Sequence, residues 1–166
     1  MSTGSGRSPV SIARARADDL PVIMALERAG FAESEQWSER NWRGELLADH
    51  RRILLARTYE PAGVISFGVV GELADLNRLV VAPAHRRQGV GSELVRAGLA
   101  TVREAGARAV ILEVDYSNEP AIALYQRLGF EQLTVHDDYY GPGRPALILK
   151  LYDLERPVDL GDRVLL

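Results

Sequence analysis

Hydrophobic positions follow two different periods along this chain. Short apolar runs, or apolar residues at every second position, are typical of strands, whereas apolar residues three or four positions apart are typical of helices. In the stretch 90–105, Val90, Leu94 and Ala97 fall on one stripe, which predicts an amphipathic helix. The same analysis predicts strands at residues 11–16, 53–57, 64–70, 75–82, 109–114, 130–136 and 146–151, and helices that run through Ala29, from Ser38, from Val90 to Ala105, and from Asn118 through Leu128.

Local signals refine the boundaries of these elements. Asp18 and Asp19 precede the first helix and are expected to cap it, and Asn118 is expected to be the N-cap of the helix that runs through Leu128. Residues 61–63 (Pro-Ala-Gly) are expected to form a turn between two strands. Gly129 and Phe130 follow the last helix in the order of a Schellman stop, in which glycine adopts a left-handed conformation and the next residue makes an apolar contact.

The predicted elements form a β-α-α-β-β-β-α-β-α-β-β order. Because the helices cluster in two places instead of alternating with every strand, the order favours an α+β fold around a mixed sheet. We expect one domain at residues 11–152, after a flexible Ser/Gly-rich segment at residues 1–10. Residues 153–166 are mixed in composition and form a tail of unpredicted structure.

Composition removes several classes of function. The 166 residues have a hydrophobic content of 46% and a net charge of −3, whereas a nucleic-acid-binding domain is usually basic. The chain has no cysteine, which excludes disulfides, thiolate metal ligands and a cysteine nucleophile. No secretory signal and no apolar run of about 18 residues is present, so we expect a cytoplasmic protein without a membrane partner. His50, His85 and His136 lack a paired spacing, so no metal is expected.

A glycine-rich segment lies where a predicted strand passes into a helix, at residues 86–91 (Arg-Arg-Gln-Gly-Val-Gly). Glycine lets the backbone approach an anion, and the N-terminus of a helix favours a phosphate. The segment is neither a Walker loop nor a dinucleotide fingerprint, because no Gly-Lys-Ser/Thr follows and Leu94 replaces the third glycine. Either a pyrophosphate site or a glycine-rich helix entry with solvated arginines fits this pattern.

Two side chains downstream could move protons. Glu113 interrupts an apolar strand and shares a face with Ile111. It is either an exposed glutamate at a sheet edge or a general base in a cleft, where burial would raise its pKa. Tyr125 lies on one face of a helix with Ala121 and Leu128, and is either a core tyrosine or a proton donor.

The combination of these segments resembles a known family. Residues 86–91 followed by residues 118–130 are similar to the acetyl-CoA core of the GNAT superfamily of N-acetyltransferases. Residues 112–114 (Leu-Glu-Val), 117–118, 121–125 and 128–130, together with the pairs Trp37-Ser38 and Tyr139-Tyr140, more closely resemble the ribosomal-protein-alanine N-acetyltransferases (RimI). The resemblance covers residues 12–151 and implies a six- or seven-stranded mixed sheet, splayed in a V at the acetyl-CoA site, with helices on both faces.

The resemblance also implies roles for individual residues. Glu113 would be the general base and Tyr125 the general acid. Trp37, Ser38, Tyr139 and Tyr140 would contact the acceptor, although core packing and a hairpin end are the structural alternatives for these aromatic residues. The residues expected at the cofactor are Leu79, Val80, Val81, Arg86, Arg87, Gln88, Gly89, Val90, Gly91, Ser92, Asn118 and Tyr125.

The implied activity is transfer of acetyl from acetyl-CoA to the N-terminal α-amine of an alanine on a ribosomal protein. Without a cysteine, direct transfer in a ternary complex is favoured over a thioester acyl-enzyme. Two alternatives stay open, namely a GNAT enzyme acting on a lysine side chain or small amine, and a non-catalytic CoA-binding module. The expected partners are acetyl-CoA and an N-terminal peptide drawn in by Glu33, Glu35, Asp137 and Asp138, with no nucleic acid, and the protein is expected to be a monomer or weak dimer.

Overall fold

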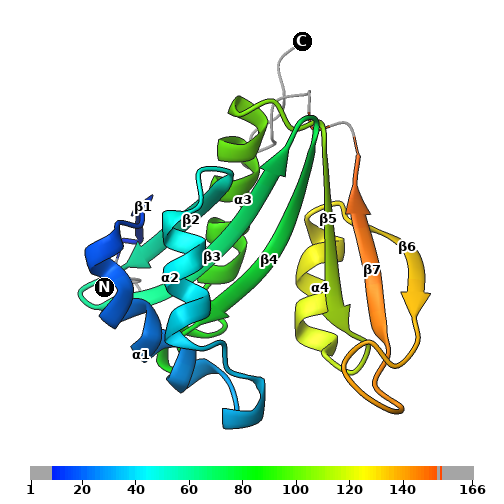
Figure 1. Cartoon of the computed structure of the whole chain (residues 1–166), viewed down its shortest axis with the longest axis horizontal. Coiled ribbons are helices and arrows are strands. Elements are labelled where there is room, and N and C mark those ends of the chain that lie inside the picture. Colours follow the sequence, from blue (N-terminus) through cyan, green and yellow to red (C-terminus); the bar gives the residue numbers. More distant parts are fainter. Residues whose placement is uncertain (1–8, 153, 155–166) are drawn as a thin grey trace, which may run out of the picture.

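A seven-stranded mixed sheet forms the centre of the molecule, with strand order β1-β2-β3-β4-β5-β7-β6 (Figure 1). The computed structural model describes residues 9–152 and residue 154. Apart from residues 9, 10 and 154, the predicted flexible segment 1–10 and the tail 153–166 lie outside the described residues. The elements, whose predicted order is confirmed, are β1 Ser11–Arg14, α1 Leu20–Gly30, α2 Glu39–Leu47, β2 Arg51–Arg57, β3 Pro61–Val70, β4 Leu73–Val81, α3 Val90–Glu104, β5 Ala109–Asp115, α4 Glu119–Arg127, β6 Glu131–His136 and β7 Ala146–Leu151.

Helices cover both faces of the sheet, as expected. On one face, Leu94 and Leu99 of α3 pack into a core cluster with Phe67 of β3, and α4 joins the same cluster through Tyr125. On the other face, α1 and α2 lie side by side in front of β2 and β3 (Figure 1), where they build a second cluster. Trp42 of α2, which is fully buried, is the largest side chain of that cluster.

The sheet is splayed between its two central strands. β4 and β5, the parallel pair, are joined only from Leu73 opposite Ala109 to Leu76 opposite Leu112. Immediately after Leu76, the register with β3 shifts, so that Asn77 is an extra residue in β4. The bulge bends β4 away, and the two strands diverge in a V that opens toward their carboxyl ends (Figure 1). The predicted splay is therefore confirmed, and the sheet is not closed.

Signals at the ends of α4 had the predicted effects. Asn118 Oδ1 accepts a hydrogen bond from the backbone N–H of Ala121 at 3.3 Å, as an N-cap does. Gly129 has a φ of +99°, and the N–H of Phe130 donates to the carbonyl of Tyr125 at 3.0 Å. The rings of Tyr125 and Phe130 are 5.7 Å apart, which supplies the apolar contact of the Schellman motif.

The other two local predictions were wrong. Pro61 already belongs to β3 and Gly63 pairs with Ala56, so the segment 61–63 is strand and not turn. Glycine occurs there because a Cβ at Gly63 would lie 2.7 Å from the carbonyl oxygen of Val80, which signals close approach and not a bend. Asp19 has helical backbone angles and makes no side-chain cap; its Oδ2 instead accepts from the Arg16 N–H at 2.7 Å.

None of the helices in residues 9–152 and 154 is long and apolar enough to cross a membrane. In the same residues, no group of three or more His, Asp or Glu side chains is arranged to hold a metal ion.

Candidate active site

The N-terminus of α3 offers a site for an anion at the mouth of the V. Gly89 is the N-cap residue, with a φ of +83° that only glycine adopts without strain, and no side chain caps the helix. The first N–H groups of a helix have no intrahelical partner. A Cβ at Gly91 would lie 3.3 Å from Leu124 and 3.5 Å from Val81, so the loop also packs closely against β4 and α4. These features fit a pyrophosphate.

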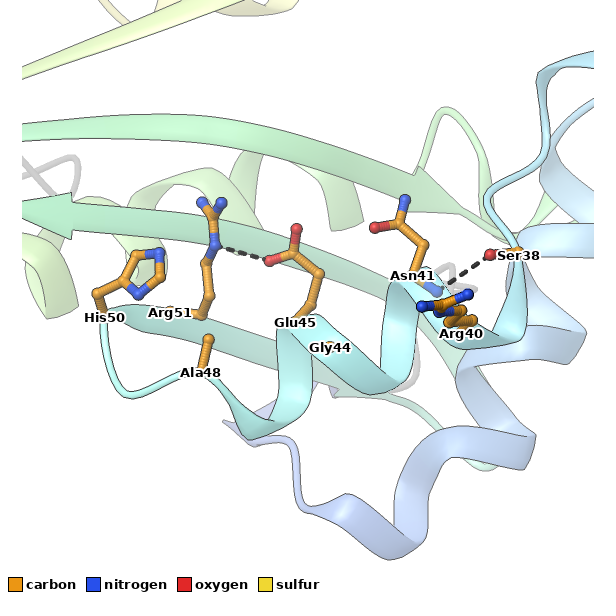
Figure 2. A pocket seen from close by; sticks show the side chains of 8 residues that line it. All are labelled: Ser38, Arg40, Asn41, Gly44, Glu45, Ala48, His50 and Arg51. Atoms are coloured by element: carbon orange, nitrogen blue, oxygen red, sulfur yellow. Dashed lines mark hydrogen bonds and ion pairs between the residues drawn. The ribbon is translucent and has the colours of Figure 1, made fainter.

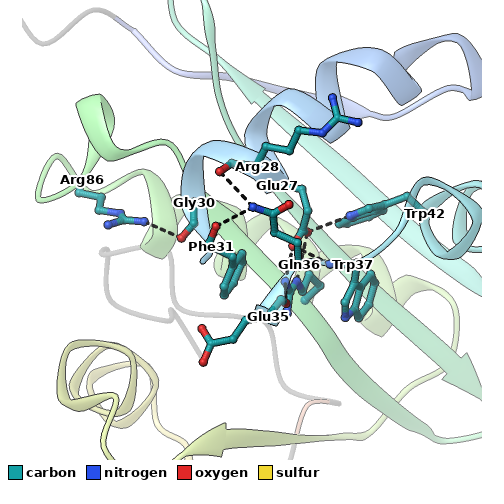
Figure 3. Close-up of polar contacts among 10 residues, drawn as sticks. Glu27, Arg28, Gly30, Phe31, Glu35, Gln36, Trp37, Trp42 and Arg86 are labelled. Atoms are coloured by element: carbon teal, nitrogen blue, oxygen red, sulfur yellow. Dashed lines mark hydrogen bonds and ion pairs between the residues drawn. The ribbon is translucent and has the colours of Figure 1, made fainter. Parts of the chain in front are cut away.

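The three polar side chains of the loop differ in their contacts. The Arg86 guanidinium donates to the carbonyl oxygens of Val81 at 3.3 Å and Gly30 at 3.1 Å, so it ties the end of α1 to β4 (Figure 3). Gln88 donates to the carbonyl of Ala84 at 3.3 Å. Arg87, at a φ of +62°, is exposed. Arg87 is therefore the arginine of this pair that is placed to reach a phosphate.

The strand segment predicted to lie along the cofactor presents two different faces. Leu79 and Val81 are partly buried against the cluster of α3 and α4, and both lie within 4.0 Å of a Cβ built at Gly91. Val80 points the other way and is 2% exposed in the cluster with α1 and α2. Only the backbone of Val80 is thus left to contact a molecule in the V.

Glu113 lies in the strand where the V opens. β5 lies inside the sheet, between β4 and β7, and Glu113 pairs with Ile148 of β7. Its side chain is exposed where β4 has already parted from β5. Its neighbours Leu112 and Val114 are buried on the opposite face. Partial burial raises the pKa of the Glu113 carboxyl, and the negative charge of Asp75 raises it further. A carboxylate with a raised pKa is a competent proton acceptor near neutral pH.

Tyr125 occupies the last turn of α4 and is 6% exposed. Burial raises the pKa of its phenol, and Tyr140 adds to the shift. The phenol therefore stays protonated at neutral pH, as a proton donor must. Tyr125 is thus a core residue whose phenol still interacts electrostatically with Tyr140.

Tyr139 and Tyr140 lie together in the loop between β6 and β7, with ring centroids 4.9 Å apart. Burial raises the pKa of Tyr140 to about 12, and the charges of Tyr139 and Glu113 contribute. Burial also raises the pKa of Tyr139, with Glu113 as the second cause. The structure therefore brings both predicted acceptor-side tyrosines to Glu113.

Trp37 and Ser38 have structural contacts of their own. The Trp37 ring lies 5.1 Å from the ring of Trp42, in the cluster between α1 and α2. Ser38 is the N-cap of α2, and its Oγ accepts from the Asn41 N–H at 3.0 Å. Packing explains Trp37 and helix capping explains Ser38, so neither residue needs contact with an acceptor substrate to explain its place. Ser38 also lines a groove beside α2 (Figure 2).

A buried ion pair beneath the connection between α1 and α2 was not predicted. The Glu27 carboxylate, which is fully buried, accepts from Trp42 Nε1 at 2.9 Å and from the Trp37 N–H at 3.1 Å (Figure 3). It also forms an ion pair with the guanidinium of Arg78, the residue that follows the bulge at Asn77. That guanidinium lies 3.7 Å from the centroid of the Phe31 ring. Arg78 therefore fastens this connection to β4. In the sequence, the only sign of this ion pair was that Arg78 interrupts an apolar strand.

A second unpredicted contact spans the front of the V. Arg144 Nη2 lies 2.8 Å from Glu35 Oε1 and 2.9 Å from Asp115 Oδ2, which joins the β6–β7 loop to the α1–α2 connection and to the end of β5. Asp138 Oδ1 accepts from the Gly143 N–H at 2.7 Å. Two of the four acids expected to attract a peptide are therefore already engaged by residues of the chain.

Comparison with known proteins shows the family and the fold of the chain. Residues 15–130 match the model of the acetyltransferase (GNAT) family. A ribosomal protein bS18-alanine N-acetyltransferase of Escherichia coli is 31% identical over 122 residues, which cover 74% of this chain and 81% of that protein. The crystal structure of an Escherichia coli ribosomal-protein-alanine N-acetyltransferase matches with a TM-score of 0.79 and 26% identity, over 95% of this chain and 99% of the other. The structure of NAA60 from Arabidopsis thaliana in complex with acetyl-CoA matches with a TM-score of 0.77 at 16% identity, over 87% and 98% of the two chains, and shows the fold alone.

Proposed function

The chain is an acetyltransferase of the GNAT family, and we propose from that premise that it acetylates the N-terminal α-amine of an alanine on a ribosomal protein. The observation that carries the proposal is the V itself. The uncapped N-terminus of α3 lies at the end of β4, and Glu113 lies on the facing part of β5. The names of the Escherichia coli relatives support an alanine amine of a ribosomal protein as the acceptor.

Acetyl-CoA would be held by the loop before α3 and by β4. The N–H groups of Gly89, Val90, Gly91 and Ser92 would bind the pyrophosphate, with Arg87 as the nearby cation. The backbone of β4 from Leu79 onward would pair with the amide-containing arm, because this part of β4 has no partner on its β5 side. When bound, acetyl-CoA supplies an activated acetyl thioester.

Glu113 would act on the acceptor. An α-amino group has a pKa of about 8, so most of it is protonated at neutral pH and must lose a proton before it attacks. The raised pKa of Glu113 brings its affinity for a proton closer to that of the amine. Glu113 would take the proton directly or through one water.

Tyr125 would act on the leaving group. A thiolate leaves more easily when it receives a proton, and a protonated phenol can give one. Asn118, the N-cap of the same helix, would lie near this end of the cofactor. No cysteine is present to carry the acetyl group, which supports direct transfer in a ternary complex. We further propose that the enzyme works in the cytoplasm as a monomer or weak dimer.

A panel of acceptors tests the proposal. The protein would be incubated with acetyl-CoA and, separately, a peptide with N-terminal alanine, a peptide with a blocked N-terminus and an internal lysine, and a set of small amines, with release of free CoA as the signal. The proposal expects the highest kcat/KM for the alanine peptide. A preference for lysine or for a small amine would replace it with that alternative, and absence of turnover with every acceptor would favour a CoA-binding module.

A further inference from the structure

The space in front of Glu113 is bridged by a single nitrogen atom. Arg144 Nη2 lies 2.8 Å from Glu35 Oε1 in the α1–α2 connection and 2.9 Å from Asp115 Oδ2. Asp115 is two residues beyond Glu113 and therefore lies on the same face of β5. Because one atom makes both contacts, the two carboxylates are much closer together than the roughly 10 Å that a strand with side chains on both faces occupies. An acceptor chain cannot pass between them while this bridge is closed.

Glu35 belongs to the side of the bridge that is held in place. Its carbonyl oxygen accepts a hydrogen bond from Arg78 Nη2 at 2.9 Å, and Arg78 in turn pairs with the fully buried Glu27. Figure 3 shows the Glu35 carboxylate directed away from Trp37 and Trp42, which contact Glu27. The backbone of Glu35 is thus fixed to β4, while its side chain is available to the bridge.

The β6–β7 loop, which carries Arg144, is the side that can move as a unit. It is held together by its own hydrogen bonds, because the Tyr140 N–H donates to the Arg144 carbonyl and the Arg144 N–H donates to the Gly141 carbonyl, both at 3.0 Å. A Cβ at Gly141 would meet nothing within 4 Å, so there is open space around the loop. The base of the loop stays at β5, since the Pro145 carbonyl accepts from the Tyr116 N–H at 3.0 Å.

The bridge is weakest at Glu35. The side chains of Arg144 and Glu35 are 47% and 44% exposed, and an exposed ion pair of this kind contributes little to stability. Asp115 is only 20% exposed, and its Oδ1 also accepts from the N–H and the hydroxyl of Ser117 at 2.9 and 2.6 Å. When the contact with Glu35 opens, Arg144 therefore keeps a partner in Asp115.

We propose that Arg144 is a latch that closes the path of the acceptor to Glu113, and that opening of its contact with Glu35 admits the acceptor chain. The inference rests on the acetyltransferase function proposed above and adds a conformational step before the transfer. An acceptor that binds only to the open protein has its affinity reduced by the fraction of the protein that is open. Breaking the latch therefore tightens acceptor binding, whereas loss of a residue that holds the acceptor would weaken it.

Spin labels test the latch without an acceptor and without turnover. Since the chain has no cysteine, Ser34→Cys in the α1–α2 connection and Asp137→Cys in the β6–β7 loop can carry a nitroxide pair, and both positions are exposed. Pulsed EPR would measure the distance between the labels in the free protein. Arg144→Met and Glu35→Met should each shift the distances to longer values, and high salt should do the same without either change. Identical distances in all of these samples would overturn the proposal.

A peptide without a free amine tests the effect on binding. An N-acetyl-alanine peptide with uncharged side chains, which is the product class of the proposed reaction, would be titrated by calorimetry into the complex with CoA. Arg144→Met and Glu35→Met change the charge of the cleft in opposite directions, yet each breaks the same contact. We expect about two- to fivefold tighter binding in both variants, and no further gain in the double variant. Unchanged or weaker binding in either single variant would contradict the latch.

Arg43→Met is the matched control, because it breaks the exposed pair of Arg43 with Glu39 on α2 and leaves the bridge intact. Its affinity for the acetylated peptide should equal that of the wild type, and tighter binding in this variant too would count against the latch. Failure of the proposed function would look different. The acetylated peptide would then bind to none of the proteins, while the distances between the spin labels would still lengthen in Arg144→Met and Glu35→Met.

Discussion

Glu113 and Tyr125 lie on opposite faces of the sheet at the place where β4 and β5 part. Glu113 alternates along β5 with Leu112 and Val114, and these two pack in the core cluster that contains Tyr125. The two side chains can therefore reach a molecule in the V from different sides. This separation allows one of them to act on an incoming amine and the other on a departing thiol.

The proposed role of Glu113 as a general base predicts a change in the pH dependence of turnover. Because the pKa of Glu113 is raised, its ionised form is lost on acidification at a higher pH than for an ordinary glutamate. The kcat/KM of the wild-type enzyme should fall as the pH decreases through that pKa. Glu113→Gln should lose most activity at neutral pH and less at high pH, where the amine deprotonates unaided.

Thermal melting supplies the control for this variant. A carboxylate whose pKa is raised in the folded protein opposes folding when it is ionised, so Glu113→Gln should not lower the melting temperature at neutral pH. A pH–rate profile identical to that of the wild type would remove Glu113 from the mechanism.

Tyr125→Phe should lower kcat by about 100-fold, within the range of general acid catalysis. The ring contact with Phe130 and the burial of the side chain are preserved by phenylalanine, so stability should change little. Steady-state kinetics and a melting curve measure the two effects. A kcat near that of the wild type would mean that another group protonates the leaving thiolate.

Gly91→Glu tests the anion site before α3. Glutamate in the first turn suits the helix dipole, whereas its charge and bulk oppose a pyrophosphate at the same N–H groups. Acetyl-CoA should raise the melting temperature of the wild-type protein by mass action, and this shift should disappear in the variant. Gly44→Ala, at a position with space around its Cβ, should keep the shift. Persistence of the shift in Gly91→Glu would place the cofactor elsewhere.

Glu27 is expected to be important for stability. Glu27→Ala leaves the Arg78 guanidinium and the Trp42 N–H without their buried acceptor, which should cost about 3–5 kcal/mol. The control is Glu39→Ala, which breaks the exposed pair with Arg43 and should cost about 0.3–0.5 kcal/mol. Urea denaturation measures both values. Similar midpoints for the two variants would show that the buried pair contributes little.

Most of the fold was accessible from the sequence because its signals are local. The periodicity of α3, the Asn118 cap and the Gly129 stop each act within a few residues, and each has the predicted effect. The reason for a glycine at position 63 could not be predicted, because it is not local. Gly63 marks close approach to another strand, which no neighbour in the sequence reveals.

The candidate site was only partly accessible, since its contacts join distant segments. The V depends on a bulge at Asn77, whose register is set by pairing with β3. Arg144 reaches Glu35 from more than a hundred residues away, so a sequence pattern could not show that Glu35 is engaged. Likewise, the ion pair between Asp75 and Arg51 joins β4 to β2, so a pattern along the sequence could not show it.

The most direct test of the central claim is to locate the transferred acetyl group. The enzyme would be incubated with acetyl-CoA and a peptide that carries both an N-terminal alanine and an internal lysine, and the product would be sequenced by tandem mass spectrometry. The account predicts one added acetyl group, on the alanine α-amine, with the reaction strongly reduced in Glu113→Gln. Acetylation of the lysine alone, or an unmodified peptide beside acetylated small amines, would contradict it.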